Sequence, residues 1–223
     1  MKASQAGLDG ARVYLDWNAS TPLRPEARAA MLEAMDIAGN PSAVHSEGRA
    51  ARAIIERARA QVAALVNCAP DEIVFTASAT EAAAMAMPEM GSVLVSDIEH
   101  EAVRAHAQRQ DVASPFTLDV GYEGRLKGTI NGTLLFDSIW DDVVAIQAAN
   151  SETGVCQDTS ALAEKIRGFG RGASILVDAV QVVGKQPVRM AALGGDFALI
   201  SAHKFGGPKG VGALWYLGKQ EPR

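Results

Sequence analysis

Short apolar runs alternate along the chain with longer stretches in which apolar residues recur at helical spacing. The runs typical of buried strands cover residues 73–76, 93–96, 133–136, 143–147, 173–181, 197–200 and 212–216, and a further short strand is expected near Phe116. Helices are expected over residues 25–38 and 48–66, from Glu81 to about Pro88, from about Asp97, and from Asp158 or Thr159 to Phe169. This alternation predicts an α/β fold, with a mostly parallel sheet of the seven-stranded type flanked by helices.

One strand ends in a cluster of chemically active side chains. The apolar run that begins at Phe197 is followed by Ser201, His203 and Lys204, and then at once by glycines and a proline. Burial of a lysine at the end of a core strand favours its neutral amine, which is a nucleophile. Taken alone, the pattern also fits an ordinary surface lysine in a Lys-Gly turn.

A second strand, residues 173–181, carries the carboxylate of Asp178. Ligands of α/β sheets bind at the carboxyl ends of the strands, so Asp178 and Lys204 are expected at the same edge. A pyridoxal phosphate (PLP) site needs a lysine that binds the cofactor covalently and an acid that holds a proton on the pyridine nitrogen. The two strand ends together therefore favour a PLP site.

A phosphate seat is predicted where the strand at residues 73–76 meets an alanine-rich helix. The turn between them consists of small residues and includes Ala79 and Thr80. Backbone N–H groups and the positive end of the helix dipole bind phosphate at such a junction, and Thr80 adds a hydroxyl. The alternative is a simple N-cap, with Glu81 favouring the helix start.

These motifs together resemble the cysteine desulfurases, relatives of the class V aminotransferases with PLP fold type I. The resemblance rests on residues 201–210 (SAHKFGGPKG), 177–181 (VDAVQ) and 150–154 (NSETG), and it runs in order from residue 14 to residue 216. It implies the large domain of that fold. Residues 1–24 would form an arm over the active site, and residues 25–223 would form the PLP-binding domain.

The resemblance also implies a role for each cofactor-binding residue. Lys204 would hold PLP covalently and then transfer protons. Asp178 would pair with the ring nitrogen, and Gln181 with the ring oxygen. His100 would stack on the ring and act as the second catalytic residue, since an imidazole is flat and titrates near neutral pH. The phosphate would be bound by the remaining residues of this set, Ala79, Thr80, Ser201 and His203.

The implied substrate is L-cysteine, with Asn150, Asn18 and Ala19 close to it, although Asn18 is equally suited to making a turn only. The implied products are L-alanine and a sulfur atom that is passed to an acceptor thiol for iron–sulfur cluster or other sulfur biosynthesis. The family's sulfur-accepting cysteine and its carboxylate-binding arginine have no counterparts here, and we expect the C-terminal small domain to be missing. Cys68 and Cys156 match no acceptor motif, and each is expected to be a small buried hydrophobe.

The expected assembly follows from the same resemblance. Family members are homodimers, so a dimer is expected, with a sulfur-acceptor protein as a further partner. The chain is then a fragment, a half completed by a complementing chain that carries the missing domain, or a stand-alone domain. A non-catalytic PLP-binding or interaction protein is one alternative, and an aminotransferase or lyase of fold type I acting on another amino acid is another.

Composition narrows the class of protein further. The 223 residues carry a net charge of −5, so no basic surface invites nucleic acid. No apolar run reaches the roughly 18 residues that a membrane span needs. The four histidines and two cysteines lack metal-ligand spacing, so no metal site is expected. We expect a cytoplasmic protein.

Overall fold

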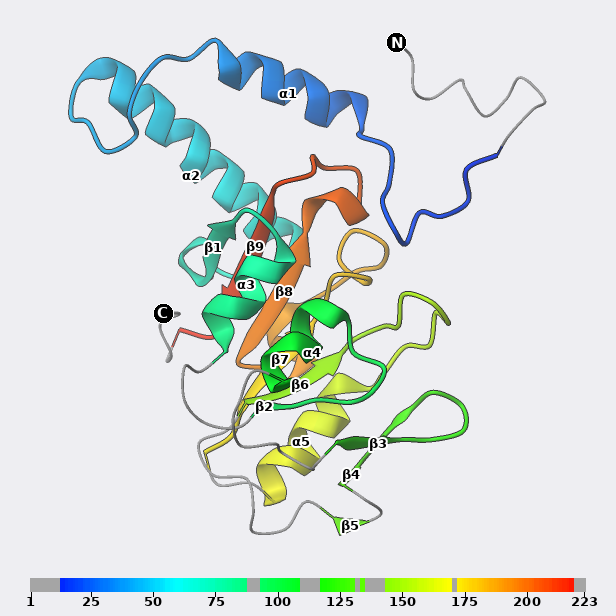
Figure 1. Ribbon diagram of the computed structural model, residues 1–223. Coiled ribbons are helices and arrows are strands. Elements are labelled where there is room, and N and C mark those ends of the chain that lie inside the picture. Colours follow the sequence, from blue (N-terminus) through cyan, green and yellow to red (C-terminus); the bar gives the residue numbers. More distant parts are fainter. Residues whose placement is uncertain are drawn as a thin grey trace.

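A six-stranded sheet forms the centre of the computed structural model, which describes residues 13–87, 93–108, 117–130, 133–134, 143–169 and 172–218 (Figure 1). Its strand order is β1-β9-β8-β7-β6-β2. In chain order these strands are β1 (Ile73–Thr76), β2 (Val93–Leu94), β6 (Val143–Gln147), β7 (Ser174–Asp178), β8 (Phe197–Ser201) and β9 (Gly212–Tyr216). Strands β2, β6, β7 and β8 pair in parallel, while β9 runs antiparallel to both β8 and β1. The predicted α/β fold with a mostly parallel sheet is confirmed.

The described part of the chain places six strands in this sheet where seven were expected. The run at residues 133–136 accounts for the difference, since its described part, β5 (Thr133–Leu134), belongs to a second sheet. There it pairs with β4 (Leu126–Ile130), which pairs in turn with β3 (Leu118–Val120), both antiparallel. A tight turn at Gly121–Gly124 joins β3 to β4. Phe116, where a short strand was expected, lies outside the described residues.

Five α-helices are described. They are α1 (Pro25–Met35), α2 (Ser46–Val66), α3 (Ala79–Ala86), α4 (Glu101–Gln108) and α5 (Thr159–Phe169). Asp158 caps α5 by accepting a hydrogen bond from the N–H of Ala161 at 3.0 Å. Helix α4 begins later than Asp97, because residues 97–99 form a turn that precedes it. Three short 3₁₀ segments complete the set: η1 (Pro70–Glu72), η2 (Met190–Leu193) and η3 (Ala202–Lys204).

The alternation of side chains along the strands produces two core layers, one on each face of the central sheet. On one face Ala145, Leu176 and Leu199 pack with the alanines of α3 and with Val103 of α4. On the other face Ile146, Val177 and Ile200 pack with α5 and with the end of α2. The sheet is therefore buried on both sides, as expected for parallel strands connected through helices.

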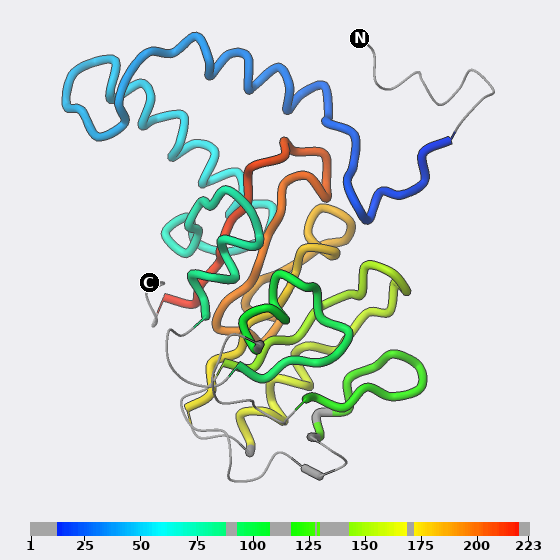
Figure 2. The backbone as a smooth tube through the Cα atoms, in the orientation of Figure 1, coloured from blue at the N-terminus to red at the C-terminus, as the bar shows by residue number. Residues whose placement is uncertain are grey.

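Helix α1 and the start of α2 project from this body (Figure 1). No residue of α1 is buried, and Leu32 and Met35 are exposed. The segment before α1 returns to the body, where the N–H of Thr21 donates to the carbonyl of His203 at 2.8 Å. Figure 2 shows this segment passing beside the turn that follows β8.

Candidate active site

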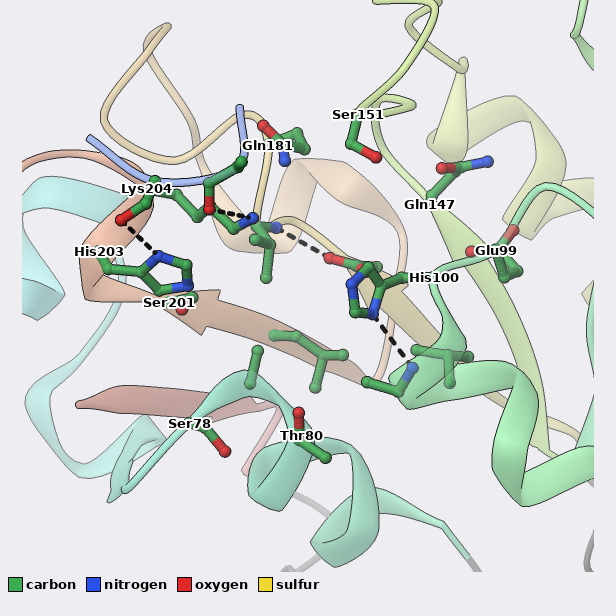
Figure 3. A pocket seen from close by; sticks show the side chains of 18 of the residues that line it. Ser78, Thr80, Glu99, His100, Gln147, Ser151, Gln181, Ser201, His203 and Lys204 are labelled. Atoms are coloured by element: carbon green, nitrogen blue, oxygen red, sulfur yellow. Dashed lines mark hydrogen bonds between the residues drawn. The ribbon is translucent and has the colours of Figure 1, made fainter. Parts of the chain in front are cut away.

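One cavity of about 680 Å³ lies at the carboxyl ends of the central parallel strands (Figure 3). It brings together ten of the eleven predicted site residues: Ala19, Ala79, Thr80, His100, Asn150, Asp178, Gln181, Ser201, His203 and Lys204. The remaining residue, Asn18, borders the cavity without lining it. Segments far apart in the sequence therefore converge on one place.

Lys204 is the amine of this cavity. It ends the short η3 turn that follows the fully buried strand β8, and it is itself half-buried. Its Nζ donates to the backbone carbonyls of Asn18 at 2.7 Å and Ala19 at 3.1 Å. Burial lowers the pKa of Lys204 below its ordinary value, and the negative charge of Asp178 opposes this shift. The site thus favours the neutral, nucleophilic amine more than water does.

Asp178 contributes a carboxylate to the cavity from the neighbouring strand. It ends β7, and the sheet register pairs it with Leu199 of β8. Its Oδ1 accepts a hydrogen bond from the N–H of Val180 at 3.0 Å. Burial raises the pKa of Asp178, while that hydrogen bond and the charges of His100 and Lys204 lower it. The acid and the amine therefore act on each other across one cavity.

The start of α3 forms one wall. Ser78 is the N-cap, and its hydroxyl accepts from the N–H of Glu81 at 3.1 Å, while the Glu81 carboxylate accepts from the N–H of Ala77 at 2.5 Å. Residues 78–80 also line the cavity, so the N-cap is compatible with a phosphate seat here, which stays a prediction. A Cβ at Gly212 of β9 would lie 2.7 Å from the Ser78 carbonyl carbon, so only glycine allows β9 to pack against this turn.

His203 and Ser201 line the cavity from the end of β8. The Nδ1 of His203 lies 3.2 Å from the Ser20 hydroxyl. Burial, and then the positive charges of Lys204 and Lys209, lower the pKa of His203 below its ordinary value. The imidazole is therefore neutral near pH 7 and can donate one hydrogen bond to an anion.

His100 lies directly before α4, where its Nδ1 accepts from the N–H of Ala102 at 3.1 Å. That contact leaves Nε2 as the ring nitrogen that is free to donate. Figure 3 shows the ring within the cavity that also holds Lys204 and Thr80. A flat ring is thus fixed by the start of α4.

The side chain of Asn150, predicted to contact the substrate, forms several hydrogen bonds within the protein. Its Nδ2 donates to the carbonyl of Ile98 at 3.2 Å and to Oε1 of Gln147 at 3.3 Å. Its Oδ1 accepts from the N–H groups of Glu152 and Thr153 and so closes the turn after β6. Contact with a substrate carboxylate stays a prediction, because both amide hydrogens already have acceptors.

Asn18 belongs to an N-terminal strap, defined here as residues 14–21, that borders the cavity. Its Nδ2 donates to the carbonyl of Ser151 at 2.9 Å, and its own carbonyl accepts from Gln181 and Lys204. Thr21 anchors the end of the strap through its N–H and hydroxyl, both of which donate to His203. Asn18 therefore does more than make a turn, and its contact with substrate stays a prediction.

Gln147 and Glu99 are polar cavity residues that were not singled out in the sequence. Gln147 ends β6 directly beside Asp178 and is 4% exposed. The rule that identified Asp178, a polar residue at the end of an apolar strand, applies equally to Gln147. Glu99 is also 4% exposed, although a carboxylate just before a helix is usually solvated. No sequence signal marks its burial.

Glu99 is held in an unusual environment. Its Oε1 accepts from the Ser96 hydroxyl at 2.8 Å, and its Oε2 has no hydrogen-bond partner among the described residues. Burial raises the pKa of Glu99 from 4.5 to about 8, although the Ser96 hydrogen bond opposes the shift. The side chain is therefore protonated at neutral pH.

This protonation makes stability depend on pH. Between pH 4.5 and about 8 the folded chain keeps a proton that the unfolded chain releases. Unfolding free energy should therefore fall with rising pH in that window, by up to about 1.4 kcal/mol per pH unit from this group. Glu99→Gln is expected to remove this contribution, measured by urea unfolding of wild type and variant across the window. Parallel pH profiles for the two proteins would contradict the prediction.

The prediction that both cysteines are buried is wrong for Cys156, which is exposed. Cys156 lies in the loop that follows the Asn150 turn and is not among the residues that line the cavity. Cys68 is partly buried, and burial raises the pKa of its thiol to about 11, which makes it a poor nucleophile.

The described residues contain no group of three or more His, Cys, Asp or Glu side chains that could hold a metal ion. No described helix combines the length and apolar character that crossing a bilayer requires.

Comparison with known proteins identifies similar sequences and folds. The model of the class-V aminotransferase family matches residues 13–221. A cysteine desulfurase of Cereibacter sphaeroides is 40% identical over 216 residues, which cover 92% of this chain and 55% of that protein. A selenocysteine lyase of Bos taurus is 30% identical, covering 99% of this chain and 58% of the lyase.

A solved NifS-like protein from Rickettsia africae superposes with a TM-score of 0.81 at 30% identity, covering 96% of this chain and 60% of that one. The chain spans about half the length of the curated relatives it matches.

Proposed function

Since this chain belongs to the class-V aminotransferase family, we propose that it is the large domain of a PLP-dependent cysteine desulfurase. Such an enzyme takes L-cysteine to L-alanine and passes the sulfur to an acceptor thiol. The observation that carries the proposal is that Lys204, just after β8, and Asp178, at the end of the adjacent strand β7, line one cavity whose wall includes the start of α3.

The residues of the cavity fit PLP. Ser78, Ala79 and Thr80 at the start of α3, with His203 opposite, suit a phosphate group, because they offer backbone N–H groups, hydroxyls and an imidazole but no carboxylate. Lys204 offers an amine for the aldehyde. Asp178, whose charge is felt by Lys204, offers an acceptor for a ring N–H.

When bound, PLP supplies a ring that takes up the electrons left behind when an amino acid loses a proton. The chain's own residues prepare that step. Asp178 would hold a proton on the ring nitrogen, His100 would support the face of the ring, and Gln181 would donate an N–H to the ring oxygen. Lys204, with its lowered pKa, accepts and returns the substrate proton at Nζ.

The direct test is to add PLP to the purified chain and record the visible absorbance. We expect a band of the lysine-bound cofactor and, after borohydride reduction, the corresponding mass increase on the peptide that contains Lys204. Reduction of a different lysine, or no band at any PLP concentration, would overturn the proposal.

Turnover is tested separately, with L-cysteine, selenocysteine and other amino acids as substrates. The selenocysteine arm is included because one relative is named a selenocysteine lyase. Alanine and sulfide are expected from cysteine once a chain carrying the rest of the family fold is added. If no alanine or sulfide forms with any such partner although PLP is bound, the result would favour a non-catalytic PLP-binding protein.

We propose two further properties on the family relationship alone. The chain forms a homodimer, tested by measuring its mass in solution, where a monomer would contradict it. The sulfur serves iron–sulfur cluster assembly in the cytoplasm, since one relative is named cysteine desulfurase IscS, and sulfur transfer to a scaffold protein is the relevant assay.

A further inference from the structure

Lys185 occupies a position for which the proposed chemistry has no assigned role. It follows the turn after β7, and its Nζ donates to the side-chain oxygens of Asn18, at 2.7 Å, and Gln181. The ion pairs found among the described residues do not include it, so its charge is directed at two amides and not at a carboxylate.

An ammonium group such as that of Lys185 fixes the orientation of an amide that it contacts. An ammonium group only donates, whereas an amide has an oxygen that accepts and a nitrogen that donates. Flipping either amide would place N–H groups against the ammonium. With its oxygen held, Gln181 donates from Nε2 to the carbonyl of Asn18 at 3.0 Å, and Asn18 donates from Nδ2 to the carbonyl of Ser151 at 2.9 Å.

The backbone around Lys185 is built tightly. Gly184 has a φ of +74°, and a Cβ there would lie 2.4 Å from Cβ of Phe205, the residue after Lys204. The N–H of Lys185 donates to the carbonyl of Val182 at 3.1 Å. Burial, and then the charge of Lys204, lower the pKa of Lys185. The turn thus holds the two lysines within each other's field, and both donate to Asn18.

We propose that Lys185 is a positioning residue of the cofactor site. It orients the Gln181 amide so that its N–H₂ group, and not its oxygen, is presented to the cofactor's ring oxygen, and it holds the strap across Lys204. The first part rests on the proposed function, since it needs bound PLP. The second part does not.

The matched variants are Lys185→Met, which keeps the chain length and removes the charge, and Lys185→Arg, which keeps donors and charge. Lys165→Met on α5 is the control, since that lysine is exposed and lies outside the cavity. Lys185→Met should weaken PLP binding about three- to tenfold, the effect of one hydrogen bond. Lys185→Arg should restore most of this loss, and Lys165→Met should have no effect.

The pH titration of the bound cofactor's visible band distinguishes an effect on the orientation of the Gln181 amide from the general electrostatic effect of removing the Lys185 charge. An N–H donor stabilises the anionic ring oxygen, so losing its orientation in Lys185→Met should move the titration midpoint to higher pH. In a Gln181→Ala background the same substitution should move it much less, because no amide remains to be oriented. Equal shifts in both backgrounds would overturn the orientation role, as would an unchanged midpoint in Lys185→Met.

Chymotrypsin cleavage after Trp17 in the strap tests the second part without cofactor. Lys185→Met should be cut several-fold faster than wild type and Lys165→Met, because the strap loses an anchor. Equal rates would overturn this part. If wild type binds no PLP on Lys204, the proposed function fails whatever this rate is, so the two failures are distinguishable.

Discussion

Lys204→Ala is expected to abolish covalent attachment of PLP and to lower turnover of the completed enzyme by at least about 10³-fold, because it removes the proposed attachment point and proton carrier. The visible band of the lysine-bound cofactor should disappear, and borohydride should leave no label on the peptide. The start of α3 is untouched, so the variant should still bind PLP noncovalently, which equilibrium dialysis can measure.

Lys165→Ala is the control for this experiment, since it removes an exposed lysine outside the cavity. It should keep the band, the label and full turnover. A band that survives in Lys204→Ala would show that another lysine carries the cofactor. In that case the lowered pKa of Lys204 would result from burial and would have no role in the reaction.

Asp178→Asn is expected to keep the attached cofactor but lose about 10²–10³-fold in turnover, the scale for removing one fixed group that stabilises developing charge. Asparagine keeps the shape and the acceptor for the N–H of Val180, so folding should change little. What is lost is the negative charge that holds a proton on the ring nitrogen. Single-turnover kinetics with cysteine, monitored by absorbance, measure the step directly.

Asp178→Asn should also lower the pKa of Lys204 further, because the Asp178 charge opposes the effect of burial. Asp36→Asn, at the exposed end of α1, is the matched control and should alter neither quantity. Turnover of Asp178→Asn equal to that of wild type would remove the carboxylate from the mechanism while leaving the attachment by Lys204 standing.

The strand ends were predictable because burial and polarity change sharply there. Asp178 and Lys204 each follow an apolar run, and parallel strands carry such residues to one edge of the sheet. The positions of Ala79 and Thr80 followed from the same local logic, as a strand runs into a helix through small residues. These signals depend on residues close together in the sequence, so they can be recognised from the sequence alone.

What escaped prediction depends on long-range contacts. Glu99 is buried because β6 and the start of α4 close around it, and nothing in its neighbours reports that. The contact of Lys185 with Asn18 joins residues 167 positions apart. Residues 133–134 have strand character but pair with β4, because propensity does not choose a partner. Cys156 is exposed although cysteine is usually buried.

The strap and the proposed cofactor both use Nζ of Lys204. As long as Lys204 is a free amine, Nζ satisfies the carbonyls of both Asn18 and Ala19. Covalent attachment of PLP at this nitrogen would leave it fewer hydrogens to donate, so at least one of those carbonyls would need a new donor. Trp17 in the strap, which is 55% exposed, would gain mobility as PLP binds. Time-resolved anisotropy of the tryptophan fluorescence could follow that binding.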